Sequence, residues 1–483
     1  MTDTDTSPRK RNPLLRIHGF GPIFDGVIEL APLTILIGPN NSGKSYAAQL
    51  AYVLSKTLTA SSSSRYSANM SSLVEEVYRD YVGSGGIESA ITEDPNLLDD
   101  DPAIRDAFYK FVELKERAVA SSLDEFFSTH VSPLSGELLE QLTSPTIELV
   151  GEASAEPLVR ISLSGGHFVA SIQIEDIAFS ARHLPKTLRD VFSVRELGRV
   201  ISERVWSQKM EEYGLFEAGH YYLPSSRSGF LTAWPLISSV LVDIVRGRLG
   251  HEPIEFAGLQ GVAGDFLQSL AGARPSSLRR RRGPRSRPVL SMQALEETIL
   301  GGRVVMQNAR NELMYDTGGI RIPVEKASSM VGELAPLDVF MRDLLQAGDL
   351  LVIDEPEAHL HPQNQRNMAK VIVRLVNEGI RVICPTHSSL ILHQISNHIV
   401  ANQSNSTDIE NMGFLPVDML DHTKVAVYSF KQGEYGTNIT AITVEEDYGI
   451  PEDDFVEVAE QIGLETLRIE MSAASEDPLE VES

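Results

Sequence analysis

The chain has 483 residues, a length that favours two or three structural units over a single small core. Hydrophobic residues make up 42% and charged residues 23%, which excludes a collagen-like chain and a largely disordered one. The 67 acidic side chains outnumber the 42 basic ones, and the net charge of −25 opposes diffuse binding to nucleic acid or to an anionic membrane.

Two further features concern the compartment. The single cysteine, Cys384, excludes an internal disulfide and a cysteine-rich metal site. Residues 1–12 are polar and basic with no hydrophobic segment behind them, so we expect no signal peptide. No run reaches the ~18 apolar residues that span a bilayer. The sequence therefore predicts a cytoplasmic protein without membrane contact.

The first predicted elements are strands. Short apolar stretches between residues 14 and 30, broken by glycines, predict a hairpin. The continuous apolar run 33–37 predicts a buried strand, and residues 46–54 have helical spacing. The expected order is therefore strand, glycine-containing loop, helix.

The loop between this strand and this helix carries the first functional motif. Residues 38–45 read GPNNSGKS, which fits the phosphate-loop pattern GxxxxGK[ST]. The glycines let backbone N–H groups converge on phosphate oxygens, and the start of the helix adds its positive dipole. We expect Lys44 to reach the β and γ phosphates of ATP and Ser45 to bind Mg²⁺. The predicted nucleotide-binding residues are Gly38, Asn40, Asn41, Ser42, Gly43, Lys44 and Ser45.

Residues 61–300 are predicted to be a large, mostly helical insertion. Alternating apolar residues between 147 and 174 predict some strands within it. Helices are expected around residues 73–81, 103–127, 191–213 and 231–248. Seven arginines lie between residues 274 and 287, and this basic loop is either solvated or a local contact for phosphate, DNA included.

A buried strand in the last third of the chain delivers two carboxylates. Residues 349–353 read DLLVI, so Asp354 stands at the carboxyl end of the strand, where it can hold Mg²⁺ together with Ser45. Glu355 follows directly, and we expect it to orient or deprotonate the attacking water.

A third strand, at residues 380–384, ends just before Thr386 and His387. One helix, at 364–378, separates it from the preceding strand, which predicts two parallel neighbours. His387 is therefore expected beside the γ phosphate as a catalytic residue together with Glu355.

These motifs together resemble a known family. Residues 38–45, the run DEPEAHLHP at 354–362 and the run THS at 386–388 resemble the ABC-type ATPase heads of the overcoming-lysogenization-defect (OLD) nucleases. Related proteins include the ATPase subunits of the PARIS and Septu phage-defence systems and, more distantly, RecF and SMC proteins. The resemblance covers residues 14–60 and 295–400, and the run YYLPSSRS at 221–228 is similar to a segment common in this group. It implies an α/β fold, an ABC-type P-loop ATPase head with a mixed sheet core.

In such heads ATP lies between two protomers, so the resemblance implies a homodimer or an assembly of dimers. A signature motif of one subunit closes on the nucleotide of the other. Residues 327–334, ASSMVGEL, match its position, although they depart from the Leu-Ser-Gly-Gly-Gln form. The residues expected to act in trans are Ser328, Ser329, Gly332 and Glu333. A serine N-cap with a following glutamate is a structural interpretation that can hold at the same time.

Two more ABC motifs are less regular here. The D-loop falls on His359 and His361, where many such heads have an aspartate at the second position. Gln173 is the candidate for the Q-loop glutamine.

The predicted division is residues 1–60 and 301–465 for the head, 61–300 for the insertion and 466–483 for an acidic tail. OLD nucleases continue into a Toprim nuclease, whose carboxylates we do not find at strand ends after His387. The acidic groups 445–447 and 452–454 are expected in loops or at a helix start.

The sequence therefore predicts an ATPase that uses ATP and Mg²⁺ and has no nuclease site of its own. By resemblance it acts in phage defence with an effector encoded nearby. Two alternatives stay open: a RecF- or SMC-like ATPase that binds DNA in repair, and a scaffold that binds ATP without hydrolysing it. The intact motifs count against the scaffold.

Overall fold

The computed structural model describes most of the predicted head and parts of the insertion. The described residues are 12–59, 102–127, 146–150, 157–164, 167–173, parts of 202–215, 219–233, 261–273, 285–307, 312–403, 407–451 and 463–469. The helix predicted at 73–81, most of those at 191–213 and 231–248, the basic loop up to residue 284, the acidic group 452–454 and the tail beyond 469 lie outside them.

Among the described residues, eleven strands form one mixed sheet in the order β6-β5-β4-β1-β2-β14-β13-β3-β12-β11-β7. Its parallel part holds β13 (Val425–Gln432), β3 (Leu33–Ile37), β12 (Arg381–Thr386), β11 (Leu350–Ile353) and β7 (His220–Leu223). The mixed α/β fold class expected from the sequence is confirmed.

The other end of the sheet is mainly antiparallel. The strands there are β1 (Leu14–Phe20), β2 (Ile23–Glu29), β4 (Thr146–Val150), β5 (Pro157–Ser164), β6 (His167–Ile172) and β14 (Thr437–Ile442). β1 and β2 form the hairpin predicted for residues 14–30. β14 joins the two parts because it runs antiparallel to β13 and parallel to β2.

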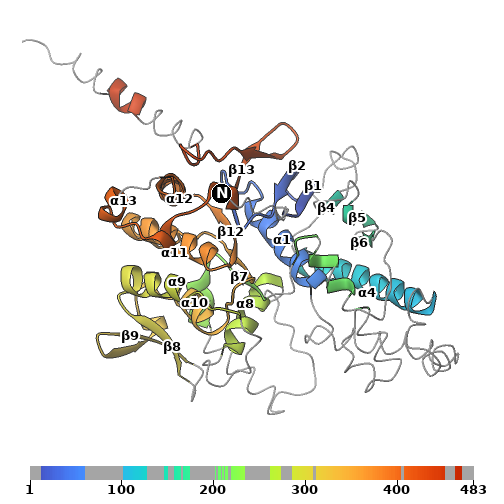
Figure 1. The fold of residues 1–483 in the computed structure, drawn as a ribbon, viewed down its shortest axis with the longest axis horizontal. Helices are drawn as coiled ribbons and strands as arrows, with labels where there is room; N and C mark the ends of the chain where they lie inside the picture. Colours follow the sequence, from blue (N-terminus) through green and yellow to red (C-terminus); the bar gives the residue numbers. More distant parts are fainter. Residues whose placement is uncertain are drawn as a thin grey trace, which may run out of the picture.

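Helices cover both faces of the sheet (Figure 1). One hydrophobic cluster packs α1 (Lys44–Thr59) and α4 (Pro102–Phe127) against one face; the other cluster holds α8 (Gly261–Gly272), α10 (Ser329–Asp343), α11 (Pro362–Asn377) and α12 (Ser389–Ala401). Successive strand residues point to opposite faces. Leu36 and Ile383 accordingly join the first cluster, and their chain neighbours Ile35 and Cys384 join the second.

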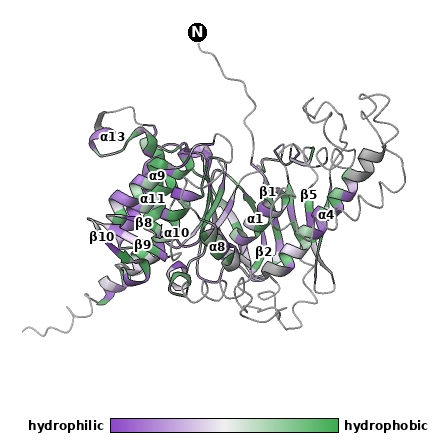
Figure 2. Cartoon of the chain, turned by 90° about the horizontal axis from the view of Figure 1, so that it is seen from below, coloured by the Kyte–Doolittle hydropathy of each residue, from purple (hydrophilic) through white to green (hydrophobic). Residues whose placement is uncertain are grey.

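A small second sheet extends from the α10 side of the molecule. Its order is β10-β9-β8, with bounds Ile320–Pro323, Glu312–Thr317 and Arg303–Gln307. The helix α9 (Val289–Leu295) and a π-helical turn at Glu296–Leu300 precede it, and α13 (Thr407–Asn411) is a short surface helix. Figure 2 shows hydrophilic residues gathered around this small sheet and α13, whereas hydrophobic residues follow the inner helices.

The predicted elements around the motifs are confirmed. β3 and α1 flank the phosphate loop, β11 precedes Asp354, and α11 leads to β12. The sequence reading did not anticipate β13 and β14, although β13 lies directly beside β3. In the described part of the chain, no helix combines the length and the hydropathy needed to cross a membrane.

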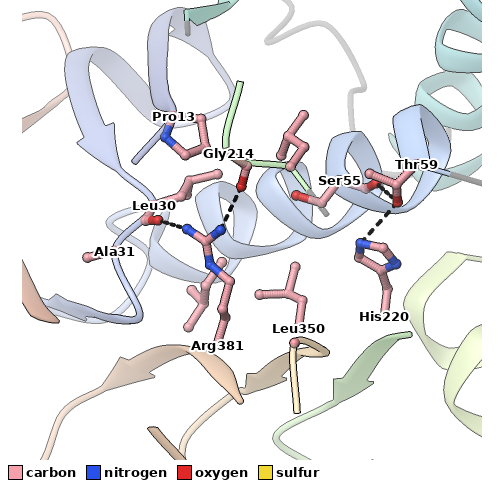
Figure 3. A pocket seen from close by; sticks show the side chains of 12 residues that line it. Pro13, Leu30, Ala31, Ser55, Thr59, Gly214, His220, Leu350 and Arg381 are labelled. Atoms are coloured by element: carbon pink, nitrogen blue, oxygen red, sulfur yellow. Dashed lines mark hydrogen bonds between the residues drawn. The ribbon is translucent and has the colours of Figure 1, made fainter. Parts of the chain in front are cut away.

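Arg381 is the first residue of β12 and lies at the amino ends of the parallel strands, opposite the end that carries the phosphate loop. Its guanidinium donates to the carbonyl oxygens of Gly214, at 2.7 Å, and of Leu30 in a small pocket (Figure 3). His220, at the start of β7, lies 3.3 Å from the hydroxyl of Thr59 in the same pocket. Burial lowers the pKa of Arg381 to about 10, so the side chain stays cationic at neutral pH. These contacts join β12 to the segment after β2, and α1 to the start of β7, at this edge.

Candidate nucleotide site

The phosphate loop lies between the carboxyl end of β3 and the start of α1, where the motif requires it. Gly38 has a φ of 143°, and a Cβ placed there would lie 2.6 Å from the carbonyl oxygen of Phe430 in β13. Only glycine therefore fits this close approach between loop and strand. The helix that follows begins at Lys44, so its free N–H groups face the loop.

Lys44 is buried against the phosphate loop. Its Nζ donates to the carbonyl oxygens of Gly38 at 2.9 Å and Pro39 at 2.7 Å. Burial lowers the pKa of Lys44 to about 8, and the nearby carboxylates of Asp354 and Glu355 oppose the shift. The ammonium group is thus held where phosphate oxygens can take over its hydrogen bonds.

Asp354 meets the phosphate loop across more than 300 residues of sequence. The Ser45 hydroxyl donates to its Oδ1 at 3.0 Å, and the Tyr222 hydroxyl in β7 donates to its Oδ2, also at 3.0 Å. Burial raises the pKa of Asp354 to about 6, and both hydrogen bonds act against that rise. Tyr222 was not singled out as a site residue in the sequence.

The predicted metal pair fits Mg²⁺. Oxygen ligands suit this ion, and the Ser45 hydroxyl and the Asp354 carboxylate already lie in hydrogen-bond contact. Ser45 and Asp354 are therefore the residues that would hold Mg²⁺ beside a bound phosphate.

Glu355 has an unusual backbone. Its φ is 48°, in the left-handed region that a residue with a Cβ seldom adopts. Its N–H donates to the carbonyl oxygen of Pro385 in β12 at 3.0 Å. The side chain is half-buried, so it is in part accessible to solvent.

His387 follows the carboxyl end of β12, the parallel neighbour of β3. Burial and the charge of Lys44 lower its pKa, and a hydrogen bond with the backbone of Gly38 opposes them. The sequence predicts this histidine beside the γ phosphate, and the structure places it in hydrogen-bond contact with the first residue of the phosphate loop.

Glu357 is a site residue that the sequence reading did not single out. Its carboxylate accepts a hydrogen bond from the Thr386 hydroxyl at 2.8 Å and another from the backbone N–H of His387. Glu357 therefore links the segment after β11 to the segment after β12. Its place in the run at 354–362 was the available signal.

The signature segment divides into an exposed part and a buried part. Ser328 and Ser329 are exposed at the start of α10, and the Ser328 hydroxyl caps the helix by accepting from the N–H of Val331 at 3.4 Å. Gly332 and Glu333 are buried. The serine N-cap is confirmed.

Glu333 differs from its expected setting. It accepts hydrogen bonds from Nε of Arg227 and from the backbone N–H of Ser228, both at 3.1 Å within the same chain. The capping interaction considered for it is therefore wrong: its carboxylate is 0% exposed and turned toward the loop after β7.

The two D-loop histidines lie at the surface. His359 has a φ of 59°, is 55% exposed and lies 3.9 Å from Glu333. His361 is exposed and caps α11, because its Nδ1 accepts from the N–H of Gln363 at 3.4 Å. Gln173, by contrast, follows β6 at the far edge of the sheet, with six strands between β6 and β3.

The described arginines of the basic loop and the acidic group 445–447 take no part in the contacts around the phosphate loop. Arg287 donates to the carbonyl oxygen of Arg342 at 3.0 Å, and Arg285 lies 4.0 Å from Asp349. Glu445 begins a turn closed by Gly449. Within the described residues, no group of three or more His, Cys, Asp or Glu side chains is arranged to hold a metal ion.

Comparison with known proteins agrees with this arrangement. Residues 291–392 match the family model of the AAA ATPase domain. That range includes the signature segment, Asp354, Glu355 and His387. A search of curated protein sequences found no match.

Three solved structures of SMC heads show a partial likeness. A SmcHead bound to the C-winged helix domain of ScpA is 12% identical with a TM-score of 0.37, and the alignment covers 90% of this chain and 98% of that one. The SMC head domain from Thermotoga maritima is 11% identical with a TM-score of 0.34, covering 90% and 100%. The Smc head domain with an extended coiled coil, bound to the C-terminal domain of ScpA derived from Pyrococcus furiosus, is 12% identical with a TM-score of 0.35, covering 94% and 100%. At these values the likeness carries no functional assignment.

The family match and the assembled site support the same activity. The phosphate loop offers backbone N–H groups and Lys44 to which phosphates can bind, and Asp354, Glu355 and His387 follow the carboxyl ends of the neighbouring strands. The chain is an ATPase that binds ATP and hydrolyses it to ADP and phosphate.

Proposed function

We propose that this chain is an ABC-type ATPase of the OLD-like branch, which dimerises around ATP and controls a partner protein in anti-phage defence. One observation carries the proposal. The phosphate loop and Asp354 lie in contact in one chain, and two serines are exposed at the start of α10. Glu333 in the same helix lies close to the Asp354 segment through Arg227. A second chain could therefore cover the nucleotide with its Ser328 and Ser329.

The residues of one chain have distinct tasks in hydrolysis. The backbone N–H groups of the loop and the Lys44 ammonium bind the phosphates. Glu355 orients the attacking water and takes its proton, while His387 stands beside the γ phosphate. Mg²⁺, when held by Ser45 and Asp354, would neutralise charge that develops on the phosphates. Closure by the partner's serines would exclude bulk water from the nucleotide.

The ATP state of the dimer is proposed to control an effector such as a nuclease. Residues 61–300 are the part of the chain that differs most from the shared head, so we expect them to bind this effector. The defence role follows the resemblance of residues 14–60 and 295–400. We expect the complex to work in the cytoplasm.

The DNA-binding alternative predicts a different behaviour. A RecF- or SMC-like ATPase would bind duplex DNA when ATP closes the dimer, and the seven arginines between 274 and 287 would supply a local contact. The net charge of −25 opposes a general grip on DNA. A gel-shift titration at low and physiological salt, with and without ATP, separates the two functions.

The dimer is tested with a Glu355→Gln chain, which keeps the shape of the side chain and removes the base. Light scattering should show the mass doubling when ATP and Mg²⁺ are added. Adding Ser328→Ala and Ser329→Ala should prevent the doubling, because these side chains would contact the partner's nucleotide. Ser171→Ala, on an exposed serine of β6, is the matched control and should dimerise normally. An unchanged mass with ATP in every chain would contradict the proposal.

A further inference from the structure

Arg227 lies at a junction of the site that the functions assigned above do not explain. It follows β7, inside the run YYLPSSRS, and its side chain is 2% exposed. A buried guanidinium needs acceptors for its N–H groups and a counter-charge. The structure supplies both, and each comes from a different functional segment.

The first set of acceptors belongs to the segment that carries the catalytic carboxylates. One terminal nitrogen of Arg227 donates to the carbonyl oxygen of Asp354 at 3.1 Å, and the other donates to that of Glu355 at 3.2 Å. The planar guanidinium thus holds two consecutive peptide groups at once.

These bonds act where the backbone is strained. The φ of 48° at Glu355 is unfavourable for a residue with a Cβ, so it persists only when the surroundings hold it. Arg227 donates to the carbonyl oxygen of Glu355, and the N–H of Glu355 donates to the carbonyl oxygen of Pro385. Releasing either contact would let the peptide turn and move the Glu355 carboxylate away from the attacking water.

The counter-charge comes from the signature helix. Glu333 lies in the second turn of α10 and accepts from Nε of Arg227, while Ser228 holds its other oxygen with both its N–H and its hydroxyl. α10 begins with the exposed Ser328 and Ser329. The ion pair between Arg227 and Glu333 therefore links the start of α10, where we expect contact with the partner's nucleotide, to the backbone of Glu355 in the same chain.

We infer that Arg227 and Glu333 form a positioning pair that acts in cis, setting the orientation of Glu355 according to the position of α10. The inference rests on the proposed dimer only for the signal that reaches α10. It assigns Glu333 to its own chain's hydrolysis and leaves the two serines as the residues that act in trans.

The first experiment measures turnover and binding in single variants. Glu333→Gln keeps the size of the side chain and removes the charge, and Arg227→Lys cannot reach all three acceptors. Both should lower kcat for ATP at least tenfold, while the Kd of a fluorescent ATP analogue stays within about threefold because the phosphate loop is untouched. Ser228→Ala should lower kcat less, and it keeps the inference testable if Arg227→Lys does not fold.

The control is a matched buried pair far from the nucleotide. Arg374 donates to Asp418 at 2.6 Å and to the carbonyl oxygen of Leu290 at 3.1 Å, and the Asp418 side chain is 0% exposed. Asp418→Asn should lower Tm at least as much as Glu333→Gln does and leave kcat within twofold. The inference would be overturned if kcat of Glu333→Gln and of Arg227→Lys, measured well below Tm, stayed within threefold of wild type.

The second experiment separates action in cis from action in trans. In a mixed dimer, a Lys44→Ala chain cannot bind ATP but offers an intact α10 to its partner. Mixed with chains carrying Ser328→Ala and Ser329→Ala, it should restore hydrolysis at one site. Mixed with Glu333→Gln chains, it should restore none, because the defect lies in the chain that holds the ATP.

The outcomes of the mixing experiment are distinguishable. Recovery with Glu333→Gln chains would show action in trans and overturn the inference. Failure of the serine mixture, with mixed dimers shown to form, would instead contradict the proposed sandwich. In that case the kcat and Kd of the Glu333→Gln chain alone still decide whether the pair positions Glu355.

Discussion

Replacing Tyr222 by phenylalanine tests how the site keeps ionised the Asp354 carboxylate, which we expect to hold Mg²⁺. The Tyr222 hydroxyl donates to Oδ2 of Asp354 at 3.0 Å, and Ser45 donates to Oδ1. Burial raises the pKa of Tyr222 well above its ordinary value, so the hydroxyl is a neutral donor throughout the working range. Phenylalanine removes this donor and keeps the edge-to-face contact with Tyr52, whose ring centroid is 5.5 Å away.

The size of the effect follows from the hydrogen bond. A hydrogen bond to a charged group contributes ~2 kcal/mol, and at ~1.4 kcal/mol per pKa unit its loss raises the pKa of Asp354 by ~1.5 units. Since the starting pKa is about 6, the variant should titrate near ~7.5. The ionised fraction at pH 7 would then fall from ~0.9 to ~0.25, and at pH 6 from ~0.5 to ~0.03.

A proton on Asp354 competes with Mg²⁺, so affinity for the ion should follow these fractions. The apparent Mg²⁺ affinity of Tyr222→Phe should fall ~4-fold at pH 7 and ~15-fold at pH 6, and it should match wild type at pH 8.5. The assay is a calorimetric Mg²⁺ titration with a non-hydrolysable ATP analogue, each variant being compared with wild type at the same pH.

Tyr52→Phe is the matched control. Its hydroxyl donates to Asp265 at 3.0 Å instead of Asp354, so its removal should leave the Mg²⁺ affinity unchanged at each pH. An equal loss for Tyr222→Phe at all three pH values would show that the hydroxyl acts through packing. No loss at pH 6 would show that it does not control the ionisation of Asp354.

Three further predictions concern the activity of the chain. Lys44→Ala should abolish ATP binding, whereas Glu355→Gln should keep the affinity and lose turnover, and equal loss of binding in both would contradict their roles. Because Asp354 must be ionised and Lys44 protonated, kcat/KM should rise with pH through about 6 and fall above about 8; a flat profile between pH 5 and 9 would refute this. The purified chain should leave DNA intact with Mg²⁺ or Mn²⁺, and cleavage lost on substituting residues 445–447 would overturn that expectation.

The sequence by itself determined the local parts of the site. The phosphate loop, its strand and its helix are contiguous, and their geometry follows from glycine, lysine and helix-start chemistry within residues 33–59. Asp354 and His387 could be placed because parallel strands joined by one helix end at the same edge of a sheet. Chain order and side-chain type were enough for these predictions.

The tertiary structure decided which distant side chains meet. Glu333 could be placed on α10 from the sequence, but its buried orientation toward Arg227 depends on how α10 packs beside the loop after β7. Tyr222 touches Asp354 because β7 pairs with β11 on the edge of the sheet, a pairing between segments more than 100 residues apart. The run VAVYSF of β13 is itself a local strand signal, whereas its place beside β3 depends on how the whole sheet packs. Hydrophobic periodicity predicts that a residue is buried. Which distant residue it contacts depends on how the whole sheet and its helices pack.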